Sequence, residues 1–415
     1  MTVAGTPSQT KKRFEIIDAL RGFALAGIVI VHVVENYVGA PTPENAMNAT
    51  HAGIPDYIVD GFIGLFLRGK FFALFSFLFG LSFFIQMENA HSKGANFGLR
   101  FLWRLLILLG IGYLHHLFYR GDILTVYAVL GILLIPFYKV DNKWILGLAA
   151  LLFLGIGRYV VFLFTQGENL FIPGEFTPDS PVVVHYFDRI KDGTLGAVLQ
   201  SNAYEGLLMK MDFQLGIFSR GYLTFGFFLL GLLVGRIKFF QNFMQRKKLV
   251  KKVLIWSSIG FVVSLGFVAI IFSQLGPNVT FDNWFAILGL TAFDLNNIAM
   301  TFIILALFVI SYRTVKGKRW LHKFAPYGRM ALTNYFFQSI IGTFLFFGWG
   351  LGYLGELRNV YTFLIALVII AVQMLISTWW LKRFHYGPLE WLWRSLTYFK
   401  WYPLKRKTTP LMSKA

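Results

Sequence analysis

Apolar segments long enough to cross a lipid bilayer recur along almost the whole chain. A transmembrane helix needs about 20 predominantly apolar residues. Hydrophobic residues make up 56% of the 415 residues and charged residues only 14%, a balance far from that of soluble domains. The sequence therefore predicts an all-α, polytopic membrane helix bundle of about ten transmembrane helices. They are expected near residues 17–38, 70–88, 101–119, 122–139, 144–165, 219–237, 252–273, 293–312, 330–350 and 359–381.

The Lys and Arg residues between these segments predict the orientation of the chain. Cytoplasmic loops of membrane proteins are enriched in both residues. If the N-terminus is cytoplasmic, the predicted inner loops are basic, whereas the outer loops 39–56 and 275–292 contain neither Lys nor Arg. Both termini are therefore expected in the cytoplasm. The predicted inner segments contain Lys93, Arg100, Lys139, Lys143, Arg246, Lys247, Lys248, Lys251, Lys252, Arg313, Lys316, Lys318, Arg319, Lys323, Lys405, Arg406 and Lys407.

This layout divides the chain into regions. Residues 1–165 form an N-terminal transmembrane bundle with the candidate site, 166–218 an extracytoplasmic cap segment, 219–385 the C-terminal transmembrane helices and 386–415 a cytoplasmic amphipathic tail. The tail contains HYGPLEWLWRSLTY, which is typical of an interfacial helix that begins at a proline. Segment 55–68 is typical of an interfacial or re-entrant helix.

The formal net charge of +19 does not indicate a nucleic-acid partner. The basic residues lie in short clusters between apolar segments rather than along one surface. Such clusters set the topology and attract anionic lipids, so the lipid bilayer is the expected partner. The chain contains no Cys, which excludes disulfides, thiolate metal sites and a Cys nucleophile.

The first predicted span, IIDALRGFALAGIVIVHVVENY, carries polar side chains along one face. At 100° per residue, one sector of about 100° contains Asp18, Arg21, His32, Glu35 and Asn36. Arg21 and His32 lie almost in line, about 16 Å apart along the helix axis. Asp18 and Arg21 can simply pair or snorkel near the inner surface. His32 is deeper and has Glu35 within reach, so it is a candidate catalytic group, with a structural histidine as the alternative.

A second group of ionisable residues lies in the outer turn, HHLFYRGDILTVYAVLG. His115 and His116 end one predicted helix, and Asp122 opens the next. Asp122 can cap that helix, or it can orient a histidine for general-base catalysis. His51, in the outer loop 39–56, is a further candidate base, although a solvated loop residue is the simpler interpretation. The spacing of these histidines does not predict a metal site.

Two other polar groups interrupt apolar segments. Arg68 and Lys70 precede the aromatic run FFALFSFLFG, either as snorkelling cations at the outer interface or as an anion site. Asn334 and Gln338 lie one turn apart, and they and Asp294 are typical of polar residues that hold neighbouring membrane helices together.

Several of these motifs together resemble a known family. IDALRGFAL, GKFFALFSFLFG, LHHLFYRGDILTVYAVLG, GRMALTNYFFQS and FHYGPLEWLWR occur in the order found in the bacterial YeiB-like family, domain of unknown function 418. That family is similar to transmembrane acyltransferases, which include the acyltransferase family 3 sugar O-acetylases and the lysosomal heparan glucosaminide N-acetyltransferase. The resemblance implies a multi-pass protein of the bacterial inner membrane.

The resemblance also implies roles for individual residues. In the O-acetylases the first helix carries an Arg, ten residues and then a catalytic His, and Arg21 and His32 fit that spacing. YeiB-like proteins more often have Asn at the position of His32, so this chain departs from that family toward the O-acetylases. In the glucosaminide enzyme the catalytic His lies in the luminal loop after the first helix, where His51 is a weaker match at a longer spacing.

The implied function is transfer of an acyl (acetyl) group from cytoplasmic acyl-CoA to a hydroxyl or amine of a small-molecule or glycan acceptor at the outer side of the membrane. Acetyl-CoA is the expected donor, without a metal. A small-molecule or ion transporter is the alternative, because it needs the same intramembrane polar residues; a membrane scaffold is a third interpretation, and a homodimer is left open. The candidate catalytic residues are His32, Asp122, His115, Glu35 and His51, and the candidate substrate-binding residues are Arg21, Asp18, Lys70, Arg68 and His116.

Overall fold

The computed structural model describes residues 14–39, 41–92, 94, 97–174, 177–275 and 279–406. Within these ranges the regular secondary structure is helical, apart from an isolated antiparallel bridge between Phe384 and Lys405, and turns and loops connect the helices. Lys93 and Lys407, both used above to predict orientation, lie outside the described ranges, as do residues 1–13 of the first region and the end of the predicted tail.

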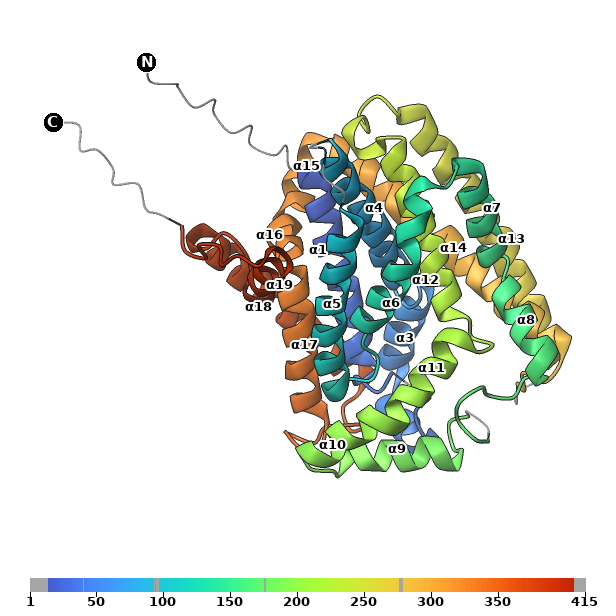
Figure 1. Ribbon diagram of the computed structural model, residues 1–415. Helices are drawn as coiled ribbons and strands as arrows, with labels where there is room; N and C mark the ends of the chain where they lie inside the picture. The colour runs from blue at the N-terminus through green and yellow to red at the C-terminus, as the bar shows by residue number, and fades with distance from the viewer. Residues whose placement is uncertain are drawn as a thin grey trace, which may run out of the picture.

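The helices are labelled in chain order (Figure 1). The first part of the chain forms α1 (Glu15–Val34), α2 (Glu44–Thr50), α3 (Ile54–Phe66), α4 (Phe71–His91), α5 (Gly98–Phe118), α6 (Leu124–Leu134), η1 (Ile135–Lys139), α7 (Asn142–Phe153), α8 (Ile156–Thr165), α9 (Pro181–Lys191), α10 (Leu195–Ser201), η2 (Asn202–Gly206) and α11 (Leu207–Leu215). The second part forms α12 (Arg220–Arg236), η3 (Phe239–Gln241), α13 (Lys247–Leu275), α14 (Trp284–Arg313), α15 (Val315–Leu321), η4 (His322–Phe324), α16 (Ala325–Arg329), α17 (Ala331–Phe346), α18 (Asn359–Arg383) and α19 (Pro388–Tyr398).

The protein is a multi-pass membrane protein, but the prediction of ten spans is wrong. Among the described residues, six helical segments are long and apolar enough to cross a membrane, or up to eight if each of two bent helix pairs forms one span. The six are α1, α3 together with α4, α5, α13, α14 and α18. Helix α3, expected to be interfacial or re-entrant, joins α4 in one apolar stretch of 38 residues.

The remaining predicted spans are broken or short, for local reasons. Segment 144–165 bends by 51° between α7 and α8, where Gly155 adopts a φ of 82° that ends a right-handed helix. Helix α12 is bent by 58° from the segment 195–215 that precedes it. Helix α6 ends at Leu134, just before Pro136. Helix α17 has 16 residues, about 24 Å of helix, which is less than the apolar thickness of a bilayer.

Helix α1 lies at the centre of the bundle, packed on α4, α16, α17 and α18. Close contact requires glycine, because a Cβ on Gly22 would lie 2.1 Å from the carbonyl oxygen of Phe324. The contact between α4 and α12 has the same basis, since a Cβ on Gly80 would lie 2.0 Å from the carbonyl oxygen of Phe228. Small residues that bring backbones together are typical of packing in membranes, where the hydrophobic effect does not drive helix association.

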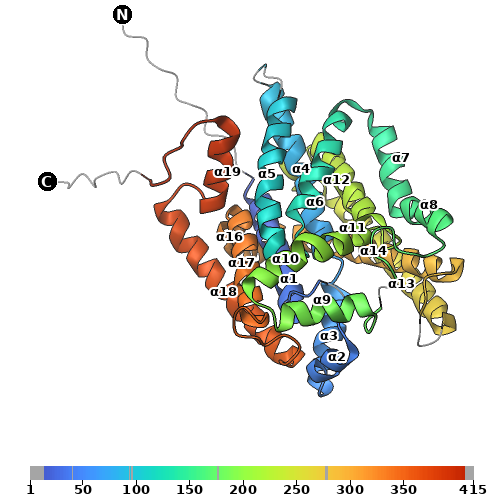
Figure 2. The ribbon, with the colours of Figure 1, turned by 60° about the horizontal axis from the view of Figure 1, so that its bottom comes forward.

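One end of the bundle, which we call the capped end, is crossed by α9 and α10 (Figures 1 and 2). It comprises residues 35–39, 41–56, 119–123, 181–201 and 347–359. The Gly348 N–H donates to the Ile190 carbonyl at 3.0 Å. Arg358 pairs with Asp56 at 2.9 Å, which ties the start of α18 to α3. The segment predicted as a cap therefore contacts the loops at this end of the bundle.

The opposite end, which we call the basic end, comprises residues 88–92, 94, 97–100, 138–143, 236–252 and 313–323. Arg236 donates to the carbonyl of Val140 at 2.7 Å, and His322 lies 3.9 Å from Glu15 at the start of α1. Most of the described Lys and Arg residues that predicted the inner loops lie at this end. A cytoplasmic basic end would place the capped end outside.

The tail helix α19 begins at Pro388, as the sequence predicts, and packs on α5. The Trp393 indole donates to the Arg104 carbonyl at 2.8 Å, and the Arg104 guanidinium lies 3.5 Å from the centre of the Trp393 ring. Glu390 accepts hydrogen bonds from the backbone N–H groups of Leu332 and Thr333 at 2.8 and 3.1 Å. Because α17 has no side-chain cap of its own at its N-cap residue, Glu390 supplies that cap from a distant part of the chain.

We therefore expect Glu390→Ala to destabilise the protein by about 1–2 kcal/mol, the usual cost of losing a helix cap. Thermal unfolding in detergent would measure the loss. Glu356→Ala is the matched control, because Glu356 makes only an exposed contact with Lys191 at 3.8 Å, a type of pair that contributes little. Equal stability of the two variants would contradict the cap.

The orientation can be tested directly, because the chain contains no Cys. Asn48 on α2 at the capped end and Lys248 at the basic end are both exposed. We expect a membrane-impermeant maleimide to label Asn48→Cys in intact spheroplasts and to label Lys248→Cys only after permeabilisation. The reverse pattern would place the basic end outside.

Candidate functional site

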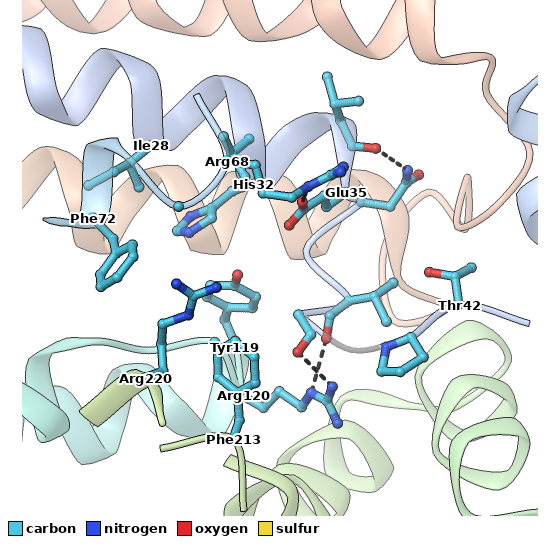
Figure 3. A pocket seen from close by; sticks show the side chains of 18 of the residues that line it. Ile28, His32, Glu35, Thr42, Arg68, Phe72, Tyr119, Arg120, Phe213 and Arg220 are labelled. Atoms are coloured by element: carbon cyan, nitrogen blue, oxygen red, sulfur yellow. Dashed lines mark hydrogen bonds and ion pairs between the residues drawn. The ribbon is translucent and has the colours of Figure 1, made fainter. Parts of the chain in front are cut away.

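A cavity of about 690 Å³ lies at the capped end of α1. Its walls come from α1, α3, α8, α11, α12, α14 and the turn 119–123, and Figure 3 shows part of the lining. Most of the lining is apolar, but many ionisable side chains also reach it: His32, Glu35, His51, Asp60, Arg68, Tyr119, Arg120, Asp122, Tyr127, Arg158, Lys210, Arg220, Asp294 and Tyr335. An apolar cavity with a few convergent polar groups is typical of a small-molecule site.

His32 enters this cavity from the last turn of α1, near Tyr119 and Arg220 (Figure 3). Its Nδ1 lies 3.3 Å from the amide nitrogen of Gln338 on α17. The Tyr37 hydroxyl is hydrogen-bonded to the amide oxygen of the same Gln338, and the Tyr119 ring lies 5.0 Å from the His32 ring. His32 thus faces the cavity rather than lipid, and a buried amide orients its imidazole.

Glu35 is paired with a cation and not with His32. Arg68, in the turn between α3 and α4, contacts Glu35 at 2.6 Å and Asp60 at 3.0 Å. Two carboxylates therefore neutralise this guanidinium. The sequence placed Glu35 and His32 on one helix face, but the tertiary structure brings a stronger partner to the carboxylate.

A buried ionic cluster joins α5, α11 and the turn before α6. Asp122 contacts His115 Nδ1 at 2.8 Å and the Lys210 ammonium at 3.2 Å. Lys210 also donates to the Thr125 hydroxyl at 2.5 Å and lies 3.4 Å from His116 Nδ1. His115 and His116 are fully buried, and neither lines the cavity. Of His32, His115 and His116, therefore, His32 alone is accessible to a ligand in the cavity.

Asp122 makes both contacts that its position in the sequence suggested. Burial alone would raise the pKa of its carboxyl group, but the charge of Lys210 and the hydrogen bond with His115 outweigh burial and hold the pKa well below its usual range. The carboxylate also accepts from the backbone N–H groups of Leu124 and Thr125 at 3.1 and 2.9 Å. It therefore caps α6 and orients His115 at the same time.

The wall of the cavity that is formed by α8, α12 and α14 contains charged residues that the sequence did not predict as site residues. Arg158 on α8 is hydrogen-bonded to Asp294 on α14 and donates to Thr291 at 2.9 Å. Arg220, at the start of α12, lies 3.6 Å from the same Asp294. Arg158 could have been found as a cation inside a predicted span. Asp294 had been interpreted only as a contact between helices, and Lys210 lay in the predicted cap.

The other predicted binding residues lie outside the cavity. Arg21 donates to Asp18 at 3.2 Å and to the Ser82 hydroxyl at 3.1 Å, near the basic end of α1. Lys70 is buried and donates to the Gly64 carbonyl at 2.5 Å. None of these three predicted residues lines the cavity around His32, so Arg21 and His32 share a helix face without sharing a pocket.

His51 lines the cavity, but its ring is held by structural contacts. Its Nδ1 lies 2.8 Å from the Met47 carbonyl oxygen, to which it donates. Its Nε2 then accepts from the Asn359 amide at 3.0 Å. Because both ring nitrogens have partners, His51 has no lone pair directed at a ligand.

The chemistry available in the cavity is that of an imidazole surrounded by fixed charges. Among the described residues, no group of three or more His, Asp and Glu side chains is arranged to hold a metal ion. The cavity can instead hold an apolar or amphiphilic molecule whose polar part meets His32, Arg220 and the Tyr119 ring.

Comparison with known proteins divides the chain into two parts. Residues 13–190 match the catalytic region of heparan-alpha-glucosaminide N-acetyltransferase. Residues 234–400 match a protein family of unknown function, DUF418. Of the cavity lining, the first match contains His32 and the turn 119–123, and the second contains Asp294 and Tyr335. The cavity is therefore built from both matched parts.

Curated relatives match over nearly their full lengths. The uncharacterized protein YxaH of Bacillus subtilis is 30% identical, with 97% of this chain and 98% of that protein aligned. The uncharacterized protein YeiB of Escherichia coli is 25% identical, with 92% of this chain and 95% of that protein aligned. The chain belongs to the YeiB-like, DUF418-containing family, which is related to transmembrane acyltransferases of the heparan-alpha-glucosaminide N-acetyltransferase type.

Proposed function

We propose that the protein is a transmembrane acyltransferase of the bacterial inner membrane. It would move an acyl group, such as acetyl, from cytoplasmic acyl-CoA to a hydroxyl or amine of an acceptor at the outer side. The observation that carries the proposal is His32, an imidazole that lines the cavity and is oriented by Gln338. The match of residues 13–190 to the catalytic region of an acetyltransferase supports it.

His32 acts as the general base through Nε2 in this proposal. Nδ1 must then carry the proton and donate to the Gln338 amide oxygen, while the amide nitrogen donates to the Tyr37 hydroxyl. A half-turn of the Gln338 amide gives this arrangement and preserves the contacts with His32 and Tyr37. The Ser339 hydroxyl, which lies 2.9 Å from the amide nitrogen, would then donate to the amide oxygen. The Nε2 lone pair is then free to accept a proton from the acceptor.

The reaction exchanges one acyl bond for another. The acceptor oxygen or nitrogen attacks the thioester carbonyl as its proton passes to His32 Nε2. The carbon–sulfur bond breaks, and the imidazolium returns the proton to the leaving CoA thiolate. Asp122 and Lys210 contribute indirectly, because they fix the turn 119–123 that forms the cavity wall beside His32.

The donor has to reach His32 from the basic end, where Arg21 lies. Leu25 and Ile28 occupy the same face of α1 between these two residues. Leu25 is fully buried, and Ile28 forms the floor of the cavity. The acyl-bearing arm of the donor must therefore displace the packing around Leu25, which makes donor entry a conformational step. Transport through the bundle, the alternative function, would need the same passage to open.

Labelled acetyl-CoA tests the proposal with purified protein in detergent. We expect His32→Ala to lower acetyl transfer, or acetyl-CoA hydrolysis without an acceptor, by at least about 100-fold, because the general base is lost. Arg21→Ala should instead weaken acetyl-CoA binding by about tenfold or more, since it removes a charge-assisted contact with the donor.

His51→Ala is the control, because both ring nitrogens of His51 have structural partners. Its turnover should stay within about threefold of the wild type, well short of the loss expected for a general base. Activity that survives in His32→Ala but not in His51→Ala would move the base to His51. A wild-type protein that neither binds nor hydrolyses acetyl-CoA would remove the acyltransferase proposal altogether.

Gln338 is expected to act as a positioning residue. Gln338→Leu removes the partner of Nδ1 and should lower kcat by about 10- to 100-fold with little change in KM, because the imidazole loses its orientation. Gln338→Glu keeps an oxygen that accepts from Nδ1 and should retain most of the activity. A purely structural role predicts instead that both variants lose thermal stability and activity together.

A further inference from the structure

The charges around the cavity are not balanced evenly among its walls. Arg68 has two carboxylates, Glu35 and Asp60, and Lys210 has Asp122. On the opposite wall, Arg158 and Arg220 share the single carboxylate of Asp294. Among these cations, the excess positive charge therefore lies on the wall formed by α8, α12 and α14. A further cation of the lining, Arg120, donates to the backbone carbonyl oxygens of Val38 and Gly39.

Arg220 is the less neutralised of the two cations that share Asp294. Arg158 is hydrogen-bonded to one carboxylate oxygen, Oδ2. Arg220 Nη1 lies 3.6 Å from the other oxygen, beyond hydrogen-bond distance, and this buried nitrogen has no hydrogen-bond partner. The side chain of Arg220 is only 17% exposed. A guanidinium with an unsatisfied donor in an apolar setting carries a large desolvation cost.

The surroundings hold this guanidinium in place at the cavity. Its central carbon lies 5.0 Å from the ring centre of Phe72 and 5.6 Å from that of Phe213. Aromatic rings at this distance attract and orient a cation, but they provide no oxygen or nitrogen atom that accepts a hydrogen bond. Arg220 points into the space beside His32 (Figure 3). A ligand in the cavity can therefore reach both side chains.

We infer that Arg220 is an anion-binding residue and that the acceptor carries a carboxylate, phosphate or sulfate group near the hydroxyl or amine that is acylated. This inference rests on the proposed function, since it assigns the cavity to the acceptor. Because Arg220 lines the cavity and its side chain is still 17% exposed, an anionic oxygen could contact the accessible part of the guanidinium, and it would offset the second positive charge beside Asp294. The planar guanidinium favours such groups because it can donate two parallel hydrogen bonds.

Binding of small anions tests the site without knowledge of the acceptor. Inorganic phosphate and glucuronate would be titrated by calorimetry into the purified protein at constant ionic strength, with glucose as the neutral analogue. We expect both anions to bind and glucose to bind at least about tenfold more weakly than glucuronate. Arg220→Gln should weaken anion binding by at least about tenfold, the effect of losing one charge-assisted contact.

Two further variants make the assignment specific. Asp294→Asn removes the carboxylate that competes for Arg220, so it should strengthen phosphate binding. Lys248→Gln removes an exposed cation at the basic end and should leave binding unchanged. The Arg220→Gln protein should fold, because Asp294 keeps its contact with Arg158; its thermal unfolding is measured in parallel.

The outcomes separate this inference from the proposed function. Failure of both anions to bind the wild type, or equal affinity in Arg220→Gln, would overturn the anion site even if acetyl-CoA is turned over. Competition between coenzyme A and phosphate that disappears in Arg220→Gln would overturn the assignment to the acceptor, because the anion would then belong to the donor. If the protein shows Arg220-dependent anion binding but neither binds nor hydrolyses acetyl-CoA, the anion site is supported and the acyltransferase function is rejected.

Discussion

The polar face of α1 has to be satisfied inside a membrane, and much of the arrangement around it follows from that requirement. A charged or polar group in an apolar medium is costly unless another group pairs with it. Arg21 donates hydrogen bonds to Asp18 and to Ser82 on α4, and His32 contacts the amide of Gln338 on α17. Glu35 is met by Arg68. Asp18 lies on α1 itself, but Ser82, Gln338 and Arg68 come from other parts of the chain, so these pairs help to hold α4, α17 and the α3–α4 turn around α1.

The cavity is formed where this packing stops. Between the level of Arg21 and that of His32, Leu25 and close-packed glycines fill the contacts of α1, whereas near His32 the surrounding walls carry charged side chains that cannot pack as closely. Those charges pair across helices, as in the contact between Asp122 and Lys210. The result is a site with rigid walls, since buried and mutually bonded charges have few alternative positions. Such rigidity suits a reaction that depends on orientation of an imidazole.

The sequence was informative where a single element determines the answer. The period of the helix placed Arg21 and His32 on one face, the turn before α6 brought Asp122 to His115, and Pro388 marked the start of α19. It overestimated the number of spans because hydropathy does not detect a left-handed glycine such as Gly155 or a helix as short as α17. It also missed Lys210 and Arg220 as site residues, because they are far in sequence from His32.

The sequence by itself determined that the protein lies in a membrane, that it is helical, that α1 has a polar face, and that basic loops alternate with loops that lack Lys and Arg. Hydropathy, helical period and charge are properties of neighbouring residues, so the sequence records them directly. Only the tertiary structure decided which partner each buried polar group received. In the tertiary structure Glu35 pairs with Arg68 instead of His32, and both ring nitrogens of His51 are hydrogen-bonded. Arg158 and Arg220 share Asp294. The physical reason is that pairing in a medium of low dielectric depends on distances of a few ångströms between segments far apart in the chain, which no local pattern records.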